Sequence, residues 1–127
     1  MGDIQLPPED RKEEENNVRI LRKLVMKESL AGEGKWLDDP KSKELYKSAL
    51  EGIKNNLLAR YKMGKLWAEV LEHGGEEELE KVLQHVEANM KKEMGPLYEV
   101  YPEKPTLRNA KRYIYFARAV EAQISSP

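Results

Sequence analysis

The sequence predicts an all-α protein, a single four-helix bundle-like domain that carries an N-terminal helical arm. Apolar residues recur every three or four positions in several segments, which is the spacing of one helix face. Clusters of glycine and proline separate these segments. With 127 residues, the chain has the length of one domain that buries its own core. The four helices are expected at residues 8–31, 40–73, 76–94 and 106–125.

The first helix is expected to begin near Pro8, because proline suits the first helical turn and the acids after it favour the positive end of the helix dipole. Residues 9–17 contain no apolar side chain. Such a stretch has no face to pack against a core, so we expect residues 1–17 to form a charged arm and residues 18–127 to form the helical domain. The apolar face begins after the arm and consists of Val18, Leu21, Leu24 and Val25.

The second helix starts at a strong capping signal. Asp39 can cap the first backbone amides, and Pro40 suits the first helical position. The apolar pattern then continues as far as Gly74 and Gly75. Two further glycines lie inside it, Gly52 and Gly64. They predict either a bend near Gly64 or places where another backbone approaches closely.

The third helix is expected to open at Glu76, where acids again favour the helix dipole, and to end at Gly95. Residues 97–105 contain several prolines and should be non-helical, and residues 97–101 alternate like a short extended segment. Thr106 can cap the last helix. One side of that helix is apolar and consists of Leu107, Ala110, Ile114, Ala117, Val120 and Ile124.

The amino-acid composition excludes several classes of protein. The absence of cysteine excludes disulfides, cysteine–zinc sites and thiol chemistry. No apolar run is long enough to span a membrane, and the first residues lack the features of a secretion signal, so we expect a protein of the cytoplasm or of a virion. Charged residues make up 35% of the chain, with a net charge of −1. The charged residues are mostly Glu and Lys, which is typical of proteins from thermophiles.

Signatures of catalysis are missing, so we expect no enzyme, no catalytic residue, no cofactor and no metal. The only histidines are His73 and His85, and neither has the carboxylate spacing of a di-iron bundle site. Glu69 and His73 lie four residues apart and could hold a metal only with further ligands. Residues 32–35 contain two glycines and a lysine, but they lack the first glycine of a phosphate-binding loop.

The charges are unevenly distributed along the chain. Residues 18–37 and 106–127 each carry a net charge of +3, whereas residues 1–17 and 74–105 each carry −4. Two helices present a strip of cations opposite their apolar face, and such strips bind phosphates without reading bases. The predicted nucleic-acid-binding residues are Arg19, Lys23, Lys27, Arg108, Lys111, Arg112, Tyr115 and Arg118. The alternative is that acids of the third helix neutralise the basic ends, within the monomer or between protomers.

The segment of residues 9–30 and the basic helix of residues 106–125 give the chain an overall layout that resembles the coat proteins of filamentous and rod-shaped archaeal viruses. This resemblance is architectural and covers the whole chain. It implies a non-enzymatic structural subunit that packages nucleic acid, with double-stranded DNA and further copies of itself as partners. The chain also resembles the small helical subunits of CRISPR effector complexes. A subunit of that kind, or a protein–protein adaptor, is the alternative function.

Overall fold

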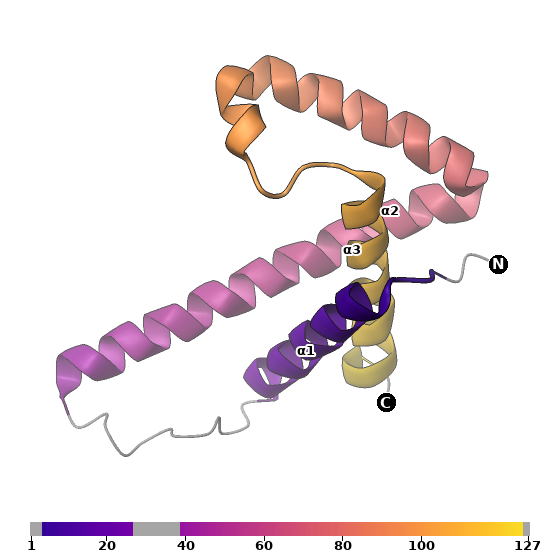
Figure 1. The fold of residues 1–127 in the computed structure, drawn as a ribbon. Coiled ribbons are helices and arrows are strands. Elements are labelled where there is room, and N and C mark those ends of the chain that lie inside the picture. The colour runs from indigo at the N-terminus through magenta and orange to yellow at the C-terminus, as the bar shows by residue number, and fades with distance from the viewer. Residues whose placement is uncertain (1–3, 27–38, 126–127) are drawn as a thin grey trace.

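A computed structural model describes residues 4–26 and 39–125. This part of the chain contains three α-helices, α1 (Pro8–Val25), α2 (Pro40–Met94) and α3 (Leu107–Val120). A 3-10 helix, η1 (Gly95–Val100), follows α2, and a π-helical turn, η2 (Glu121–Ser125), follows α3. The described residues form no strand, so the predicted all-α class is confirmed (Figure 1).

The second and third predicted helices both lie within α2, where a sharp bend at the predicted boundary separates them. At Gly75 the backbone leaves the helical region, with φ 73° and ψ −170°. Figure 1 shows that the chain reverses its direction there, so that the part after the bend passes above the part before it. We call residues 40–74 the proximal half of α2 and residues 76–94 its distal half. A four-helix bundle is therefore not confirmed, because residues 4–26 and 39–125 contain three α-helices of unequal length and the longest is bent.

Capping side chains fix the starts of α2 and α3 as the sequence predicts. Asp39 accepts a hydrogen bond from the amide of Ser42 at 2.9 Å. Thr106 accepts one from the amide of Asn109 at 3.1 Å. Each bond satisfies an amide that has no partner within its own helix. The predicted end of the first helix near Gly32 lies outside the described residues.

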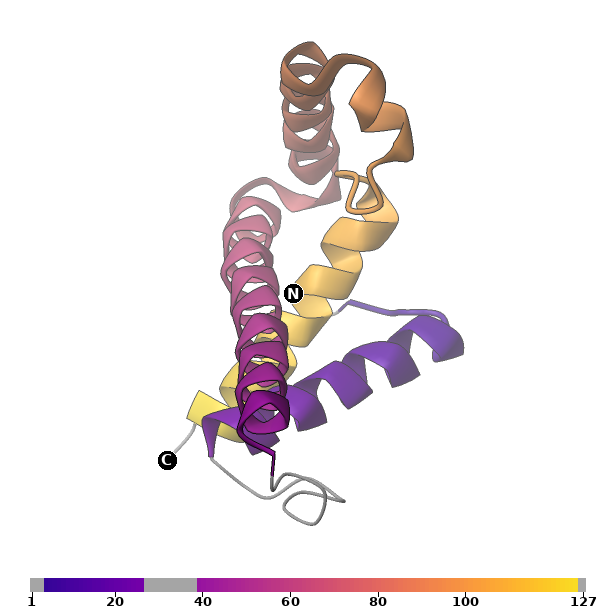
Figure 2. The ribbon, with the colours of Figure 1, turned by 90° about the vertical axis from the view of Figure 1, so that its left-hand side faces the viewer.

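Helix α3 packs against α2 and contributes more buried apolar residues to the core than any other helix. Its residues Ile114 and Phe116 are fully buried. One core cluster joins α3 to both halves of α2 around Trp67 and Leu79, and a second joins α3 to α1 and to Leu57 of α2. Seen from the side, α3 runs from below the distal half of α2 down to the level of α1 (Figure 2).

Gly64 lies at the crossing of α2 and α3. A side chain at this position would overlap the backbone of Tyr113 and come within 2.8 Å of the Cβ atom of Ala117. Of the two interpretations of Gly64, the close backbone approach is therefore the one that the structure supports. The bend occurs instead at Gly75, where a positive φ favours glycine.

The segment after α2 differs from its prediction. Residues 97–101 were expected to be extended, but residues 95–100 form η1. Tyr98 is buried within η1, and its hydroxyl donates a hydrogen bond to Glu87 at 3.1 Å. The extended segment was predicted from the alternation of apolar and polar residues. In the structure only Tyr98 is buried, against the distal half of α2, and a tight helical turn achieves this.

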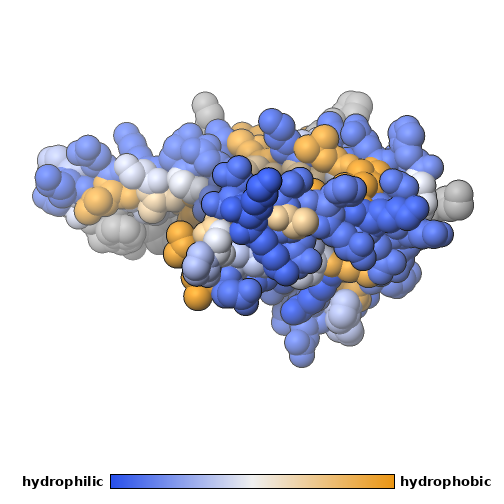
Figure 3. Space-filling view, turned by 90° about the horizontal axis from the view of Figure 1, so that it is seen from above, coloured by the Kyte–Doolittle hydropathy of each residue, from blue (hydrophilic) through white to orange (hydrophobic). Residues whose placement is uncertain are grey.

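The surface of the molecule contains both hydrophilic and hydrophobic regions. Seen from above, over the distal half of α2, the surface is mostly hydrophilic and is interrupted by separate hydrophobic patches (Figure 3). Among the described residues, no helix is long and apolar enough to cross a membrane.

Candidate functional site

The charged arm expected at residues 9–17 is a packed part of α1. Asp10 and Glu14 are buried, with 3% and 0% of their surfaces exposed. They lie four residues apart, and Val18 and Leu21 continue the same buried face. The prediction of a projecting stretch relied on the absence of apolar residues, but carboxylates that meet arginines can be buried as well. Asp10 and Glu14 therefore belong to the buried face of α1, whereas Arg11, Lys12 and Glu13 are exposed.

Asp10 forms a two-point ion pair with Arg108 of α3. The Nε atom of Arg108 donates to one carboxylate oxygen at 3.0 Å, and its Nη2 atom donates to the other at 2.8 Å. Such a geometry holds both side chains in a fixed orientation. The hydrogen bonds from Arg108 lower the pKa of Asp10 below its ordinary value, and they outweigh the opposing effect of burial.

Glu14 lies between two arginines from different helices. The Nη1 atom of Arg60, from α2, lies 3.1 Å from both carboxylate oxygens. Arg112, from α3, contacts one oxygen through Nε at 2.8 Å and through Nη2 at 2.7 Å. Asn17 adds a hydrogen bond at 3.2 Å. Glu14 is therefore the point at which all three α-helices are joined by charge.

The surroundings of Arg60 extend this cluster. Its guanidinium lies over the ring of Tyr113, 4.6 Å from the ring centre. The hydroxyl of Tyr113 donates a hydrogen bond to Glu103, in the segment that leads into α3. A further bond joins α3 to α1, because the hydroxyl of Tyr115 donates a hydrogen bond to Glu15 at 3.0 Å. We call this set the charged cluster; it comprises Asp10, Glu13, Glu14, Glu15, Arg60, Arg108, Arg112, Tyr113 and Tyr115.

The residues of the basic strip predicted on α3 all contact acidic side chains of the same chain. Arg108, Arg112 and Tyr115 contact acids of α1. Lys111 pairs with Glu76 of α2 at 3.5 Å. Arg118 pairs with Glu72 of α2 at 3.3 Å. Each of these five residues thus has an acidic partner within the monomer, and most of the neutralising acids belong to α1 rather than to the third predicted helix.

The predicted strip of α1 has a different environment. Arg19 is exposed and donates a hydrogen bond to Asn16 at 2.7 Å. Lys23 is half-buried. Lys27 lies outside the described residues. The structure therefore brings together the members of the α3 strip but does not join Arg19 to them.

Sequence reasoning missed Asp10, Glu14 and Arg60 as organising residues. One signal in the sequence could have identified the two acids. Asp10 and Glu14 extend the helical spacing of Val18 and Leu21 towards the N-terminus, so they occupy the core-facing side of the helix. No such signal marks Arg60, since its role depends on where α2 crosses α1.

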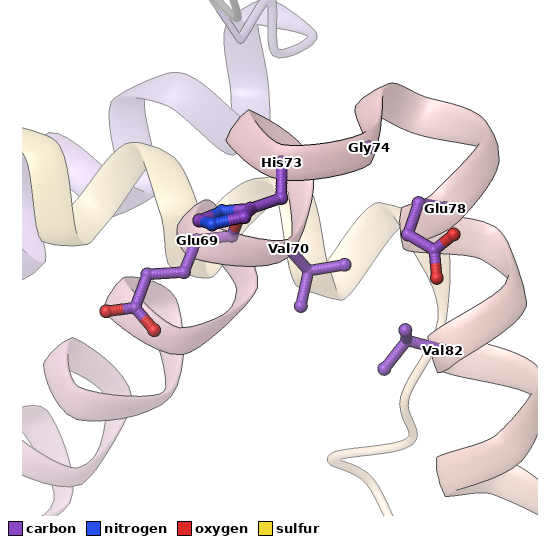
Figure 4. A pocket seen from close by; sticks show the side chains of 6 residues that line it. All are labelled: Glu69, Val70, His73, Gly74, Glu78 and Val82. Atoms are coloured by element: carbon purple, nitrogen blue, oxygen red, sulfur yellow. The ribbon is translucent and has the colours of Figure 1, made fainter.

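A shallow cavity of about 410 Å³ lies inside the bend of α2. Figure 4 shows that the carboxylates of Glu69 and Glu78 lie on opposite sides of it. The Nδ1 atom of His73 lies 3.0 Å from the backbone oxygen of Glu69 rather than beside a carboxylate. Among the described residues, no three histidine or acidic side chains are grouped so that they could hold a metal ion.

Exposed apolar side chains also occur outside the charged cluster. We call residues 18–26, at the end of α1, and residues 40–56, at the start of α2, the basic end, because together they contain seven basic and two acidic residues. Large apolar side chains are exposed within it, including Leu45 at 64% and Ile53 at 43%. The distal half of α2 contains three basic and six acidic residues. It leads into η1, where Leu97 and Val100 are 67% and 78% exposed.

Comparison with known proteins gives no match, because no family model fits the chain and no curated sequence or solved structure is significantly similar to it.

Proposed function

We propose that this protein is a non-enzymatic structural subunit that assembles with further copies of itself. The observation that carries the proposal is the exposed start of α2. Leu45, Ala49 and Ile53 are spaced four residues apart and form one row on the helix. This row continues into Leu57, which is buried in the core. In Figure 1 the first turns of α2 extend beyond α1 and α3, so the core-facing side of the helix continues past its internal partners.

Exposed apolar side chains in a row favour a protein partner. Apolar surface that is removed from water contributes about 25 cal/mol per Å², so a continuous row is a source of binding energy. Patches of this kind on otherwise hydrophilic surfaces mark interaction sites. Catalysis is a weaker proposal, because the buried carboxylates Asp10 and Glu14 are already bound to arginines and are not available to a substrate.

Nucleic-acid packaging of the viral-coat or nucleoprotein type is the second candidate function, and the charge of the basic end favours it. Seven basic and two acidic residues give residues 18–26 and 40–56 a net charge of +5. They include Arg19 and Lys23 from the strip predicted on the first helix. Phosphates of double-stranded DNA would contact this end rather than α3, because Arg108 and Arg112 would first have to leave Asp10 and Glu14.

Sedimentation velocity tests the primary proposal. We expect the weight-average sedimentation coefficient to rise with protein concentration in the absence of DNA. A monomer at every concentration from micromolar to millimolar would overturn self-assembly.

A titration with double-stranded DNA at low salt tests the second candidate. The double variant Arg19→Glu, Lys43→Glu should weaken binding, and the double variant Lys81→Glu, Lys92→Glu, whose lysines lie on the distal half of α2, serves as its matched control because it changes the net charge equally. Equal binding by both variants would contradict DNA contact at the basic end.

A further inference from the structure

The two buried acids of α1 occupy anion-binding positions. Glu14 is fully buried between the guanidiniums of Arg60 and Arg112, which come from two different helices. Asp10 accepts two hydrogen bonds from Arg108. The guanidinium of arginine binds carboxylates and phosphates with the same fork of donors, so positions that hold one of these anions also suit the other. The three arginines, which we call the covered site, therefore have the chemistry of a phosphate-binding surface.

The part of α1 that lies over the covered site has little apolar attachment. We call residues 8–17 the acidic half of α1, and their only buried side chains are Asp10 and Glu14. Apolar burial begins at Val18, in the other half of the helix. Before α1, Ile4 packs against the core but is only partly buried. The acidic half can therefore leave α3 while Val18 holds the rest of the helix in place.

The charges of the two elements are complementary. The acidic half contains five acidic and two basic residues, giving −3, whereas α3 contains four basic residues and no acidic one, giving +4. Arg108 also offers a phosphate a first point of contact, because 69% of its side-chain surface is exposed although it pairs with Asp10. A phosphate that arrives there competes with Asp10 for the same donors. Displacement of Asp10 then leaves Glu14 as the one buried acid that still attaches the acidic half.

We propose that the covered site binds the phosphate backbone of nucleic acid, and that the acidic half of α1 closes it until phosphates displace Asp10 and Glu14. The acids of α1 act as an internal competitor, so the apparent affinity is the intrinsic affinity reduced by the fraction of open molecules. This inference goes beyond the proposed function. It depends neither on self-assembly nor on DNA contact at the basic end, which requires no movement of α1.

Distances between two spin labels test the displacement in the full-length chain. The chain contains no cysteine, so only introduced cysteines are labelled. One pair is Lys12→Cys with Lys62→Cys, which joins the acidic half to α2. The matched control pair is Arg22→Cys with Lys62→Cys, because Arg22 lies beyond Val18 on the same helix. All three labelled positions are exposed, so the labels should leave the packing intact.

We expect a short DNA duplex at low salt to lengthen or broaden the distance distribution of the Lys12 pair and to leave that of the Arg22 pair unchanged. Bound duplex with both distributions unchanged would overturn the proposal, because the nucleic acid would then bind elsewhere. An equal change in both pairs would also overturn it, since the whole of α1 would then move.

Binding affinity provides a second test. The variant with a weakened cover is Asp10→Asn, Glu13→Gln, Glu15→Gln. It retains the fully buried Glu14, so the fold should be kept, and circular dichroism checks this. The matched control removes the same charge from three exposed acids of the distal half of α2, in the variant Glu77→Gln, Glu80→Gln, Glu93→Gln.

We expect the weakened cover to bind the duplex about tenfold more tightly than its control, because a larger fraction of molecules is open. Adding Arg108→Gln should remove most of this gain, whereas adding Lys81→Gln, which removes the same charge from the distal half of α2, should not. Equal affinities of the two triple variants, or equal losses from the two added changes, would mean that net charge alone governs binding and would overturn the covered site. If neither the wild type nor the weakened cover binds the duplex, the proposal fails as well, whatever sedimentation shows about self-assembly.

Discussion

Gly64 and Tyr113 are in backbone contact at the crossing of α2 and α3, with no room for a side chain between them. A methyl group at residue 64 would overlap the carbonyl group of Tyr113, which cannot move without displacing its helix. The buried ring of Tyr113 and the charged cluster beside it depend on this short distance between the helices.

Gly64→Ala should therefore destabilise the protein, by roughly 1–3 kcal/mol, because overpacking forces the two helices apart. Gly52 is the matched control, since no other group lies within 4 Å of a side chain placed there. Gly52→Ala should stabilise the protein by about 1 kcal/mol through its higher helix propensity. Urea denaturation measures both variants, and equal effects of the two would contradict the close crossing.

Glu14→Ala should be among the most destabilising single changes in the chain. Arg60 and Arg112 have 18% and 13% of their side-chain surfaces exposed, so each would remain largely buried with only a more exposed acid, Glu103 or Glu13, as its partner. Loss of one partner of a buried ion pair costs about 3–5 kcal/mol. The comparison is Glu13→Ala, which removes a carboxylate with 62% exposure and should cost at most about 1 kcal/mol. Similar midpoints for the two variants in urea would contradict the burial of Glu14.

Asp10 should make the protein sensitive to acid. Its pKa is lowered in the folded chain by the hydrogen bonds from Arg108, whereas the unfolded chain has the ordinary value near 3.8. The contribution of Asp10 is therefore complete above the unfolded pKa and is lost as the pH falls through the folded one. Between these two values the unfolded state binds the extra proton. Below about pH 4, the midpoint temperature of thermal unfolding should fall less steeply with decreasing pH in Asp10→Asn than in the wild type. Parallel plots of midpoint temperature against pH for the two proteins would refute this assignment.

Two tyrosines should reduce stability at alkaline pH. Burial raises the pKa of Tyr98 and of Tyr115 above the ordinary value of 10.0, and the adjacent carboxylates Glu87 and Glu15 raise it further. Above pH 10 the unfolded chain loses protons that the folded chain retains, so stability decreases as the pH rises. The double variant Tyr98→Phe, Tyr115→Phe should have a flatter stability profile between pH 9 and about 11. Absorbance of tyrosinate in the folded wild type provides an independent measurement of the same two groups.

Gly75→Ala should disturb the bend of α2. A φ of 73° with a ψ of −170° belongs to a region that is almost restricted to glycine, and another residue there costs of order 1–3 kcal/mol. Small-angle scattering should detect a larger radius of gyration if the helix straightens, and thermal unfolding should detect the strain if it does not. An unchanged shape together with unchanged stability would contradict the bend.

The sequence was a good guide where local chemistry decides the structure. Asp39 and Thr106 cap their helices as predicted, and Gly95 ends α2, because each acts on its own few residues. Hydrophobic spacing also identified the buried side of α3, including Ala110 and Ile114.

Prediction was weaker where the outcome depends on a distant partner. Residues 9–17 lack apolar side chains, yet Glu14 is fully buried because it pairs with Arg60 and Arg112. These arginines lie 46 and 98 positions further along the sequence. The cations of α3 had the pattern of a phosphate-binding strip, but that pattern cannot reveal which acids they meet. Gly75, by contrast, interrupts the helical backbone where the sequence predicts the helix to stop, because its positive φ is a local property of glycine.

The interactions that attach α1 to α3 also determine which part of the molecule unfolds locally. Its N-terminal half is attached to α3 by ion pairs rather than by apolar packing, whereas α3 is joined to α2 by fully buried residues such as Ile114. When this half of α1 detaches, both members of each ion pair regain their hydration, and little apolar surface meets water. Detachment of α1 is therefore a local event that leaves the pairing of α2 and α3 intact. We therefore expect the backbone amides of residues 11–17 to exchange with solvent through this local opening, at a rate that rises with salt concentration, and those of α3 to exchange only when the whole chain unfolds.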